Sequence, residues 1–484
     1  MTLGWGAMFM NKMTVSQIPV SQARRLIINS VGELKSLHLT SIIWFFLFHI
    51  PLALLMFKVS FIATLHAFAT LFIGIAWATV GRRIDRVAYI GAYIVGSEVL
   101  WRMTNAGVFW EYGKYATAAI FILAMLRRRQ LKQPLLPLLY FLLLLPSVLL
   151  TVQNLPYEVT RRQLSFNLSG PFALMICAMF FSHLSLGREQ VYRMFLLVIG
   201  PLFGIVSISL YTTLTASSIV FSEHSSNFIT SGRFGPNQVS AVLGLGALLA
   251  FLLYFFSDRR RQEFKILMLF GIIIFATDSA LTFSRGGLYV AAGGAILASM
   301  YLVKDARSRV TLIFLFLLFF FVAHFFLLPS LDTITDGALS ARFQSTELTG
   351  RDELLLDELD IWRENPIFGI GPGMAVSHWE LFFGPAAAHT EFSRLLAEHG
   401  VFGIGALLLL LIMTFRNLKY AQSLVGKAFI ASMIGWSFLF MLVNAMRIVA
   451  PAFIFGLTFV ILLPLENENP LRMNNLFRSH TISL

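Results

Sequence analysis

Long apolar stretches alternate with short charged clusters along most of the chain. A membrane-spanning helix needs ~20 mostly apolar residues, whereas a transmembrane strand would show a short alternating pattern that is not seen here. The pattern therefore predicts an all-α, polytopic transmembrane helical bundle of about 12 to 14 spans. The apolar segments lie at about 40–57, 59–80, 87–103, 114–126, 134–151, 170–186, 193–213, 236–257, 265–281, 287–303, 309–328, 391–414, 425–443 and 448–463.

Composition supports a membrane protein and narrows its chemistry. Charged residues make up 13% of the chain and hydrophobic residues 57%, against about 25% charged residues in a soluble domain. The single cysteine, Cys177, excludes an intrachain disulfide and a cysteine-based metal site. The net charge of +12 would suggest nucleic acid in a soluble protein, but in a membrane protein basic residues mostly anchor cytoplasmic loops. We therefore expect no nucleic-acid partner.

The basic clusters predict the topology. They begin near residues 81, 127, 187, 258, 304 and 416, and all fall on one side of the membrane if both termini lie there too. By the positive-inside rule that side is the cytoplasm. The predicted organisation is a cytoplasmic N-terminal segment (1–39), a transmembrane bundle (40–328), an external loop (329–390), C-terminal transmembrane helices (391–463) and a cytoplasmic tail (464–484).

The loop 329–390 is long, strongly acidic and internally patterned. Its stretch "RDELLLDELDIWRE" predicts an amphipathic surface helix over 351–364. Asn365-Pro366 should end that helix, and "GIGPGM" should form a flexible glycine-rich turn. The predicted apolar stripe of the helix consists of Leu354, Leu355, Glu358, Leu359 and Trp362.

Three separate polar motifs end up on the external face in this topology. Arg233 lies in "SGRFGPNQVS" before a span, Arg285 in "TFSRGGLYV" between two spans, and His389 immediately before the 391–414 span. Arg285 sits in a connection of only a few residues beside two glycines, which allow a ligand close to the backbone. A guanidinium presents a rigid fork of donors that matches phosphate oxygens. The motifs therefore predict an anion site at the membrane surface.

Structural roles compete with these interpretations. Arg233 and Arg285 could each extend to lipid headgroups, and Arg351 could pair with Asp352 and Glu353. Histidines near the outer face do not have the i, i+3 or i, i+4 spacing of a helical metal site, so we expect no metal. Neutral imidazole can instead take a proton from a hydroxyl, which makes His389 a candidate general base.

The motif around His389 resembles that of a known family. "HTEFSRLLAEHGVFG" is similar to the His-[Asn/Ser/Gln]-x9-Gly-x-x-Gly signature of bacterial O-antigen ligases and the related polysaccharide polymerases, with Thr390 departing at its second position. "GRFGPNQVS", "TFSRGG" and the loop "GRDELLLDELDIWRENPIFGIGPG" are similar to other motifs of that family. Together these motifs span about 233 to 403, while residues 1 to 200 match only in being helical and membranous.

The resemblance implies a type C membrane glycosyltransferase of the bacterial inner membrane, acting on the periplasmic face without a cofactor or metal. The donor would be a glycan on undecaprenyl diphosphate, and the acceptor either lipid A-core or a lipid-linked oligosaccharide. Arg233 and Arg285 would bind the diphosphate, Arg351 would be a weaker candidate for binding donor or acceptor, and His389 would act as base. Gly286, Gly400 and Gly403 would support the motifs.

Two alternatives remain open at this stage. A ligase and a polymerase use the same donor and differ in the acceptor, so the shared motifs do not separate them. A transporter or lipid flippase also fits many spans, but it should carry charged groups near the bilayer midplane and internal repeats. Apart from Glu98 and Arg102, whose i, i+4 spacing allows a pair within the bundle, charges within the spans are scarce.

Overall fold

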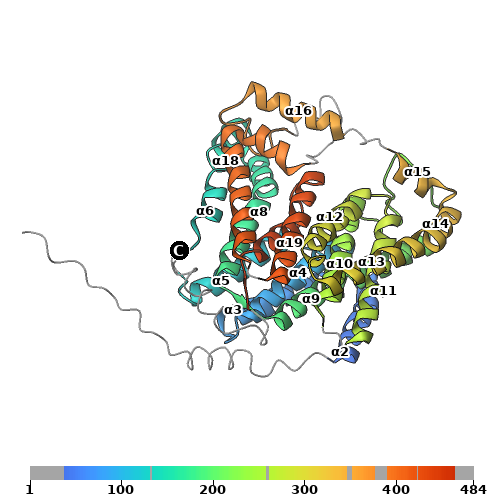
Figure 1. The fold of residues 1–484 in the computed structure, drawn as a ribbon. Helices are drawn as coiled ribbons and strands as arrows, with labels where there is room; N and C mark the ends of the chain where they lie inside the picture. Colours follow the sequence, from blue (N-terminus) through green and yellow to red (C-terminus); the bar gives the residue numbers. More distant parts are fainter. Residues whose placement is uncertain are drawn as a thin grey trace, which may run out of the picture. The chain divides into compact units, whose positions relative to one another are not determined.

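The computed structural model describes residues 38–130, 133–257, 261–345, 351–375, 390–421 and 423–463 (Figure 1). Helices dominate this part of the chain. The helices are α2 (Leu39–Lys58), α3 (Ser60–Thr79), α4 (Asp85–Met103), α5 (Tyr112–Arg127), α6 (Leu135–Leu142), α7 (Val148–Asn154), α8 (Tyr157–Ser182), α9 (Arg188–Leu214), α10 (Pro236–Phe256), α11 (Gln262–Leu281), α12 (Arg285–Leu302), α13 (Ala306–Val322), the π-helix η1 (Ala323–Leu327), α14 (Leu328–Thr335), α15 (Ala338–Gln344), α16 (Arg351–Glu364), α18 (Glu391–Tyr420), α19 (Leu424–Val443) and α20 (Ala450–Leu457). One short parallel pair joins β1 (Ser185–Leu186) to β2 (Ile461–Leu462).

The predicted fold class is confirmed, because the chain is an all-α polytopic membrane protein. Within the described residues, 9 helical stretches are long and apolar enough to cross a membrane. In a bilayer a helix satisfies its own backbone hydrogen bonds, which explains why the apolar stretches are helical throughout. The structure describes neither the segment before residue 38 nor the tail after 463, so the predicted cytoplasmic termini lie outside the described residues.

Several apolar segments fold differently from the prediction. The segment at 134–151 forms two short helices, α6 and α7, because Pro146 lies in the turn between them. The segment at 309–328 continues through η1 and α14 to Thr335. The last predicted segment contains only the eight-residue α20, followed by β2.

The helices around the candidate site pack through small residues. Helix α12 lies beside both α10 and α19, and α4 lies beside α9. At the α10–α12 contact, a Cβ on Gly244 would lie 2.3 Å from the carbonyl oxygen of Gly287. Such a contact allows the two helix backbones to approach closely, as is common between membrane helices. This contact fixes the relative positions of the N-terminal ends of α10 and α12.

Helix α16 matches the predicted bounds and packs against α18, as Figure 1 shows at the top of the view. Its buried stripe differs from the predicted one. Leu354, Glu358 and Ile361 are buried, whereas the Leu355 side chain is 38% exposed. The stripe is therefore rotated by about one residue, because the helix packs along positions spaced four and three residues apart.

Candidate active site

The two arginine motifs lie against each other. Ser284 Oγ donates a hydrogen bond to Asn237 Oδ1 at 2.7 Å, and Ser240 Oγ donates to the Ser284 carbonyl oxygen, also at 2.7 Å. Asn237 belongs to "GRFGPNQVS" and Ser284 to "TFSRGG". The N-terminal ends of α10 and α12, which carry these motifs, are thereby joined.

Neither helix end has a side-chain cap, and Pro236 leaves the first position of α10 without a backbone N–H. The N-cap residues are Gly235 for α10 and Ser284 for α12. A helix N-terminus carries roughly half a positive charge and unpaired N–H groups, which favour an anion. Two such ends beside Arg233 and Arg285 concentrate positive potential at one place.

Backbone strain marks the same place. Arg233 and Phe283 have φ values of 58°, in the left-handed region that few non-glycine residues adopt. The first is the motif arginine itself, and the second lies two residues before Arg285. Strain of this kind costs ~1–3 kcal/mol per residue and tends to occur at functional sites.

Arg285 is oriented by α15. Its Nη1 donates to the carbonyl oxygen of Arg342 at 3.3 Å, and also donates to the carbonyl oxygen of Ser345. Arg342 is buried, and it donates from Nε to the carbonyl oxygen of Phe283 at 3.2 Å and from Nη1 to that of Glu223 at 2.9 Å. Because of these contacts α15 holds the start of α12 in place. Arg233, in contrast, is exposed, and its side chain makes no hydrogen bond with the rest of the described chain.

The glycines after Arg285 differ from each other. A Cβ on Gly287 would lie 2.1 Å from the Ser240 carbonyl oxygen, so only glycine fits there. A Cβ on Gly286 would meet Val443 at 3.6 Å, an ordinary contact. The close approach to α10 therefore depends on Gly287, whereas Gly286, which was expected to support the motif, has room for a side chain.

The candidate base precedes α18. His389 lies outside the described residues, and Thr390 is the N-cap of the helix, with Oγ1 accepting the backbone N–H of Ser393 at 3.1 Å. Threonine, serine and asparagine all cap helices well. The departure at Thr390 from the family signature thus leaves the capping hydrogen bond in place.

A buried ionic cluster occupies the first turns of α18. Arg394 Nε donates to Glu391 Oε2 at 3.2 Å, and its two terminal nitrogens pair with Glu391 and Glu398. All three side chains are at most 2% exposed. Glu391 Oε2 also accepts the backbone N–H of Met446 at 3.1 Å, and Glu398 Oε1 accepts that of Gly373 at 2.8 Å. The cluster thereby joins α18 to the α19–α20 connection and to the turn after α16.

A second carboxyl of this region comes from α16. Glu358 is 1% exposed, and its Oε2 accepts a hydrogen bond from the Ser393 hydroxyl. Its other oxygen has no partner among the described residues. Burial raises the pKa of Glu358 to about 8, with the carboxylates of Glu398 and Glu391 raising it further and the Ser393 hydroxyl and Arg394 opposing the rise. The Glu358 carboxyl, with its raised pKa, therefore contacts Ser393, which lies one helical turn after Thr390 on α18.

The glycine-rich turn after α16 is held against a break in α18. Gly400 has a non-helical backbone, with φ at 59° and ψ at −133°. The Val401 N–H donates to the Pro366 carbonyl oxygen at 2.9 Å, and the Gly371 N–H donates to that of Glu398 at 3.0 Å. The turn predicted to be flexible is thus a bonded, largely buried segment. Gly403 also lies in a tight contact, because its Cβ would meet the Leu395 carbonyl oxygen at 2.0 Å.

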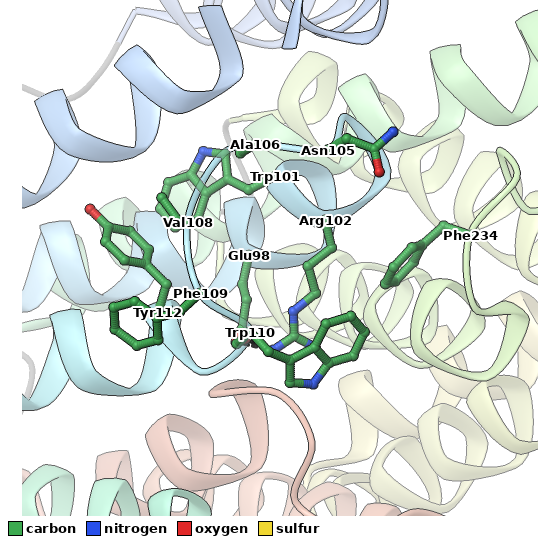
Figure 2. A pocket seen from close by; sticks show the side chains of 11 residues that line it. Glu98, Trp101, Arg102, Asn105, Ala106, Val108, Phe109, Trp110, Tyr112 and Phe234 are labelled. Atoms are coloured by element: carbon green, nitrogen blue, oxygen red, sulfur yellow. Dashed lines mark hydrogen bonds and ion pairs between the residues drawn. The ribbon is translucent and has the colours of Figure 1, made fainter. Parts of the chain in front are cut away.

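The α19–α20 connection links this region to α4. Glu98 Oε2 accepts the Val449 N–H at 2.6 Å, and Arg102 Nη2 donates to the Arg447 carbonyl oxygen at 3.0 Å. The pair that the spacing of Glu98 and Arg102 allows is present as an ion pair, with 2.7 Å between Arg102 Nη2 and Glu98 Oε1 (Figure 2). Arg102 Nη1 also donates to Gln238 Oε1 in the Arg233 motif, at 2.7 Å. Hydrogen bonds therefore connect the ends of α4, α10, α12 and α18 at one end of the bundle.

Arg447 lies within this connection. Its guanidinium stacks on the Phe166 ring at 3.9 Å. Burial lowers its pKa to about 10, and the nearby Arg394 lowers it further while the buried glutamates oppose this. It remains a cation at neutral pH.

Sequence reasoning placed some of these residues and overlooked others. Arg351 opens α16, and nothing is described of its side chain, while His389 lies outside the described residues. Asp278, seven residues before Arg285, is buried and forms no ion pair with it. The residues overlooked as parts of the site are Gln238, Arg342, Glu358, Glu391, Arg394, Glu398 and Arg447. The spacing of Glu391, Arg394 and Glu398 on one face of an apolar helix was the signal that could have revealed the cluster.

The fold and this end of the bundle define a multi-pass membrane protein with a cationic surface site beside buried carboxyl groups. Residues 270–408 match the family model described as O-antigen ligase, which confirms the resemblance to that family. The matched segment contains Arg285, Arg351, His389, Gly400 and Gly403, but not Arg233. It supports a ligase or polymerase type of activity, with lipid-linked glycans and lipid acceptors as the general substrates. No curated protein matches the chain.

Proposed function

We propose that the protein is an O-antigen ligase-like glycosyltransferase of the bacterial inner membrane. It transfers a glycan from undecaprenyl diphosphate to a hydroxyl of lipid A-core on the periplasmic face, with inversion and without a metal. Both termini would then be cytoplasmic. The alternative acceptor is a second lipid-linked repeat unit, which would make the protein an O-antigen or exopolysaccharide polymerase.

The Ser284–Asn237 hydrogen bond is the observation that carries the proposal. It joins two uncapped helix ends, each with a motif arginine. A diphosphate bound there would receive backbone N–H groups from both ends and donors from Arg233 and Arg285. A site built for charge on the leaving group stabilises the transition state more than the ground state, which is the requirement for catalysis.

His389 would supply the base. In the proposed step the acceptor oxygen bonds to the anomeric carbon, the bond from that carbon to the diphosphate oxygen breaks, and the hydroxyl proton passes to the imidazole. The Thr390 cap starts α18 directly after His389, and the ionic cluster ties that start to the rest of the site. The base would thus be attached to the same rigid end of the bundle as the arginines.

The acceptor is tested by reconstitution. Purified protein in nanodiscs receives a lipid-diphosphate-linked oligosaccharide, with or without lipid A-core, and the products are separated on a gel. Glycan on the core supports the ligase, and a lengthening ladder on the donor lipid without core supports the polymerase. Movement of the lipid across the bilayer with no new glycosidic bond would instead support the transporter.

The residue roles are tested separately. His389→Ala should lower the transfer rate by ~10²–10⁴-fold, the usual range for a general base. Arg285→Lys should also be slow, because an ammonium lacks the bidentate fork. His183→Ala provides a control, since that histidine contacts Gln133. Wild-type turnover by a folded His389→Ala protein would rule out the proposed base.

A further inference from the structure

A pocket of about 200 Å³ lies beside the arginine motifs, between the end of α4, the connection to α5 and the segment before α10. Figure 2 shows the side chains that surround it. Its volume is below the ~300–1,000 Å³ of sites for drug-sized ligands, so it suits a single ring rather than a whole glycan. The residues that line the pocket include Trp101, Arg102, Asn105, Phe109, Trp110 and Phe234.

The aromatic side chains offer ring surfaces to the pocket. Trp101 Nε1 donates to His66 Nδ1 at 2.8 Å, and the Tyr112 hydroxyl donates to the Ala67 carbonyl oxygen at 2.9 Å. Their polar atoms are therefore already bonded elsewhere. Phe109, which is 56% exposed, adds a further ring. A pyranose has a face of C–H groups that packs well on such surfaces, as apolar groups do on aromatic rings generally.

Two unpaired polar groups accompany the rings. The Asn105 side chain is exposed and makes no hydrogen bond within the described part of the chain. Its backbone has a φ of 52°, a conformation in which asparagine is tolerated better than most residues. Trp110 is 42% exposed, and its Nε1 likewise has no partner among the described residues. An amide and an indole N–H are donors and acceptors of the kind that sugar hydroxyls require.

Arg102 fixes this arrangement. Its guanidinium stacks on Trp110 at 4.3 Å and donates to the Trp110 carbonyl oxygen at 2.7 Å. The same group holds Gln238, as described above, and Phe234 follows Arg233 directly in sequence. The pocket and the proposed diphosphate site therefore share one wall.

From this geometry we infer that the pocket binds one pyranose ring of a substrate glycan, through the rings of Trp110 and its neighbours and the Asn105 amide. The inference rests on the proposed function, which supplies the diphosphate next to it. The ring belongs either to the lipid-linked donor or to the acceptor glycan. Both present the same chemistry, a ring with hydroxyl groups on its edge and C–H groups on its face.

The test measures binding to the full-length protein in nanodiscs by isothermal titration. The three probes are oligosaccharide released by mild acid from the host's lipid-linked donor, core oligosaccharide released from its lipopolysaccharide, and undecaprenyl diphosphate without sugar. The variants are Trp110→Ala and Asn105→Gly, the second chosen because glycine keeps the positive φ and removes only the amide. Trp44→Ala is the control, since that tryptophan is 72% exposed on α2, away from the pocket.

We expect Trp110→Ala to weaken the binding of one of the two oligosaccharides by about 10-fold. This is the loss in affinity that an aromatic contact and its buried area predict. Asn105→Gly should weaken the binding of the same oligosaccharide by about 3-fold or more, as expected for a lost hydrogen bond. Undecaprenyl diphosphate should bind both variants as it binds the wild-type protein. The oligosaccharide affected identifies the ring as part of the donor or of the acceptor.

Three results would overturn the inference. In the first, the wild-type protein binds neither oligosaccharide. In the second, the variants bind all three probes with wild-type affinity. In the third, the variants lose affinity for undecaprenyl diphosphate alone, which would make the pocket a site for the prenyl chain. Transfer is measured in parallel. Oligosaccharide binding that depends on Trp110 in a protein without transfer activity would overturn the proposed function and leave the sugar site standing.

Discussion

Arg342 and Arg285 each hold the other's segment of backbone: Arg285 Nη1 donates to the Arg342 carbonyl oxygen, and Arg342 Nε donates to the carbonyl oxygen of Phe283, two residues before Arg285. Phe283 is one of the two strained residues near the site. A buried arginine on α15 therefore supports both the conformation that precedes α12 and the side chain at its start. Such support is what keeps a strained backbone in place.

Arg342→Lys should slow transfer by ~10- to 100-fold, because a small misplacement of a binding group is costly and an ammonium cannot reach both the Phe283 and Glu223 carbonyls as a fork does. The measurement is the initial rate in the nanodisc assay, with thermal unfolding as a check on the fold. Arg363→Lys is the matched control, because Arg363 forms an exposed ion pair with Asp360. A wild-type rate for folded Arg342→Lys would show that α15 does not position Arg285.

Glu358 should make stability depend on pH. With a pKa of about 8, Glu358 keeps its proton in the folded protein up to about that pH, whereas the carboxyl of an unfolded chain releases it near its usual pKa of 4.5. The folded state therefore binds more protons between these values, and its stability should fall as pH rises through that window. Thermal unfolding from pH 5 to 9 should show a smaller decline for Glu358→Gln than for the wild-type protein.

The control for that experiment is Glu364→Gln, which removes an exposed carboxyl from the end of the same helix. It should reproduce the wild-type decline. Parallel curves for Glu358→Gln and wild-type protein would mean that Glu358 keeps its charge when buried.

The ionic cluster of α18 should respond differently to partial and complete neutralisation. Arg394→Met leaves two buried carboxylates without their cation and should destabilise the protein by ~3–5 kcal/mol. The triple variant Glu391→Gln, Arg394→Met and Glu398→Gln should recover most of the lost stability. It buries no unpaired charge, and glutamine oxygens can still accept the Met446 and Gly373 N–H groups. Unfolding in detergent measures both, with exposed Lys419→Met as the control. A triple variant no more stable than Arg394→Met would refute this account.

The two glycines after Arg285 should differ in how well they tolerate a side chain. Gly287→Ala forces a Cβ against the Ser240 carbonyl oxygen and should separate α10 from α12, lowering the unfolding temperature by several degrees. Gly286→Ala meets only Val443 at an ordinary distance and should fold as the wild-type protein does. Equal loss of stability in both variants would contradict the helix contact described here.

The sequence predicted the helical class and the polar motifs because both depend on local information. Twenty apolar residues are enough to indicate a membrane helix, and the bounds of α16 followed from an amphipathic pattern ended by Asn365-Pro366. The resemblance to the O-antigen ligase family came from motif spacing in the same way.

The contacts that assemble the site could not be predicted, because they join residues far apart in the chain. Nothing local to Arg342 indicates the Phe283 carbonyl, and nothing near Arg102 indicates Gln238. The flexible turn was the wrong interpretation of "GIGPGM" for a related reason. Glycines allow mobility and close packing equally, and only the neighbouring break at Gly400 shows that packing is what they serve here.

The ionic cluster also bears on how the chain is made. Glu391, Arg394 and Glu398 lie in the first turns of α18, before its break at Gly400, and charged residues raise the cost of entering lipid by up to ~2.5–3.5 kcal/mol each. One partner of Glu391 is the backbone of Met446, which leaves the ribosome after α18 and α19. This hydrogen bond of the cluster can therefore form only once the α19–α20 connection has been synthesised. A chain cut short before residue 446 should consequently lack this contact and leave the buried charges of α18 less fully hydrogen-bonded.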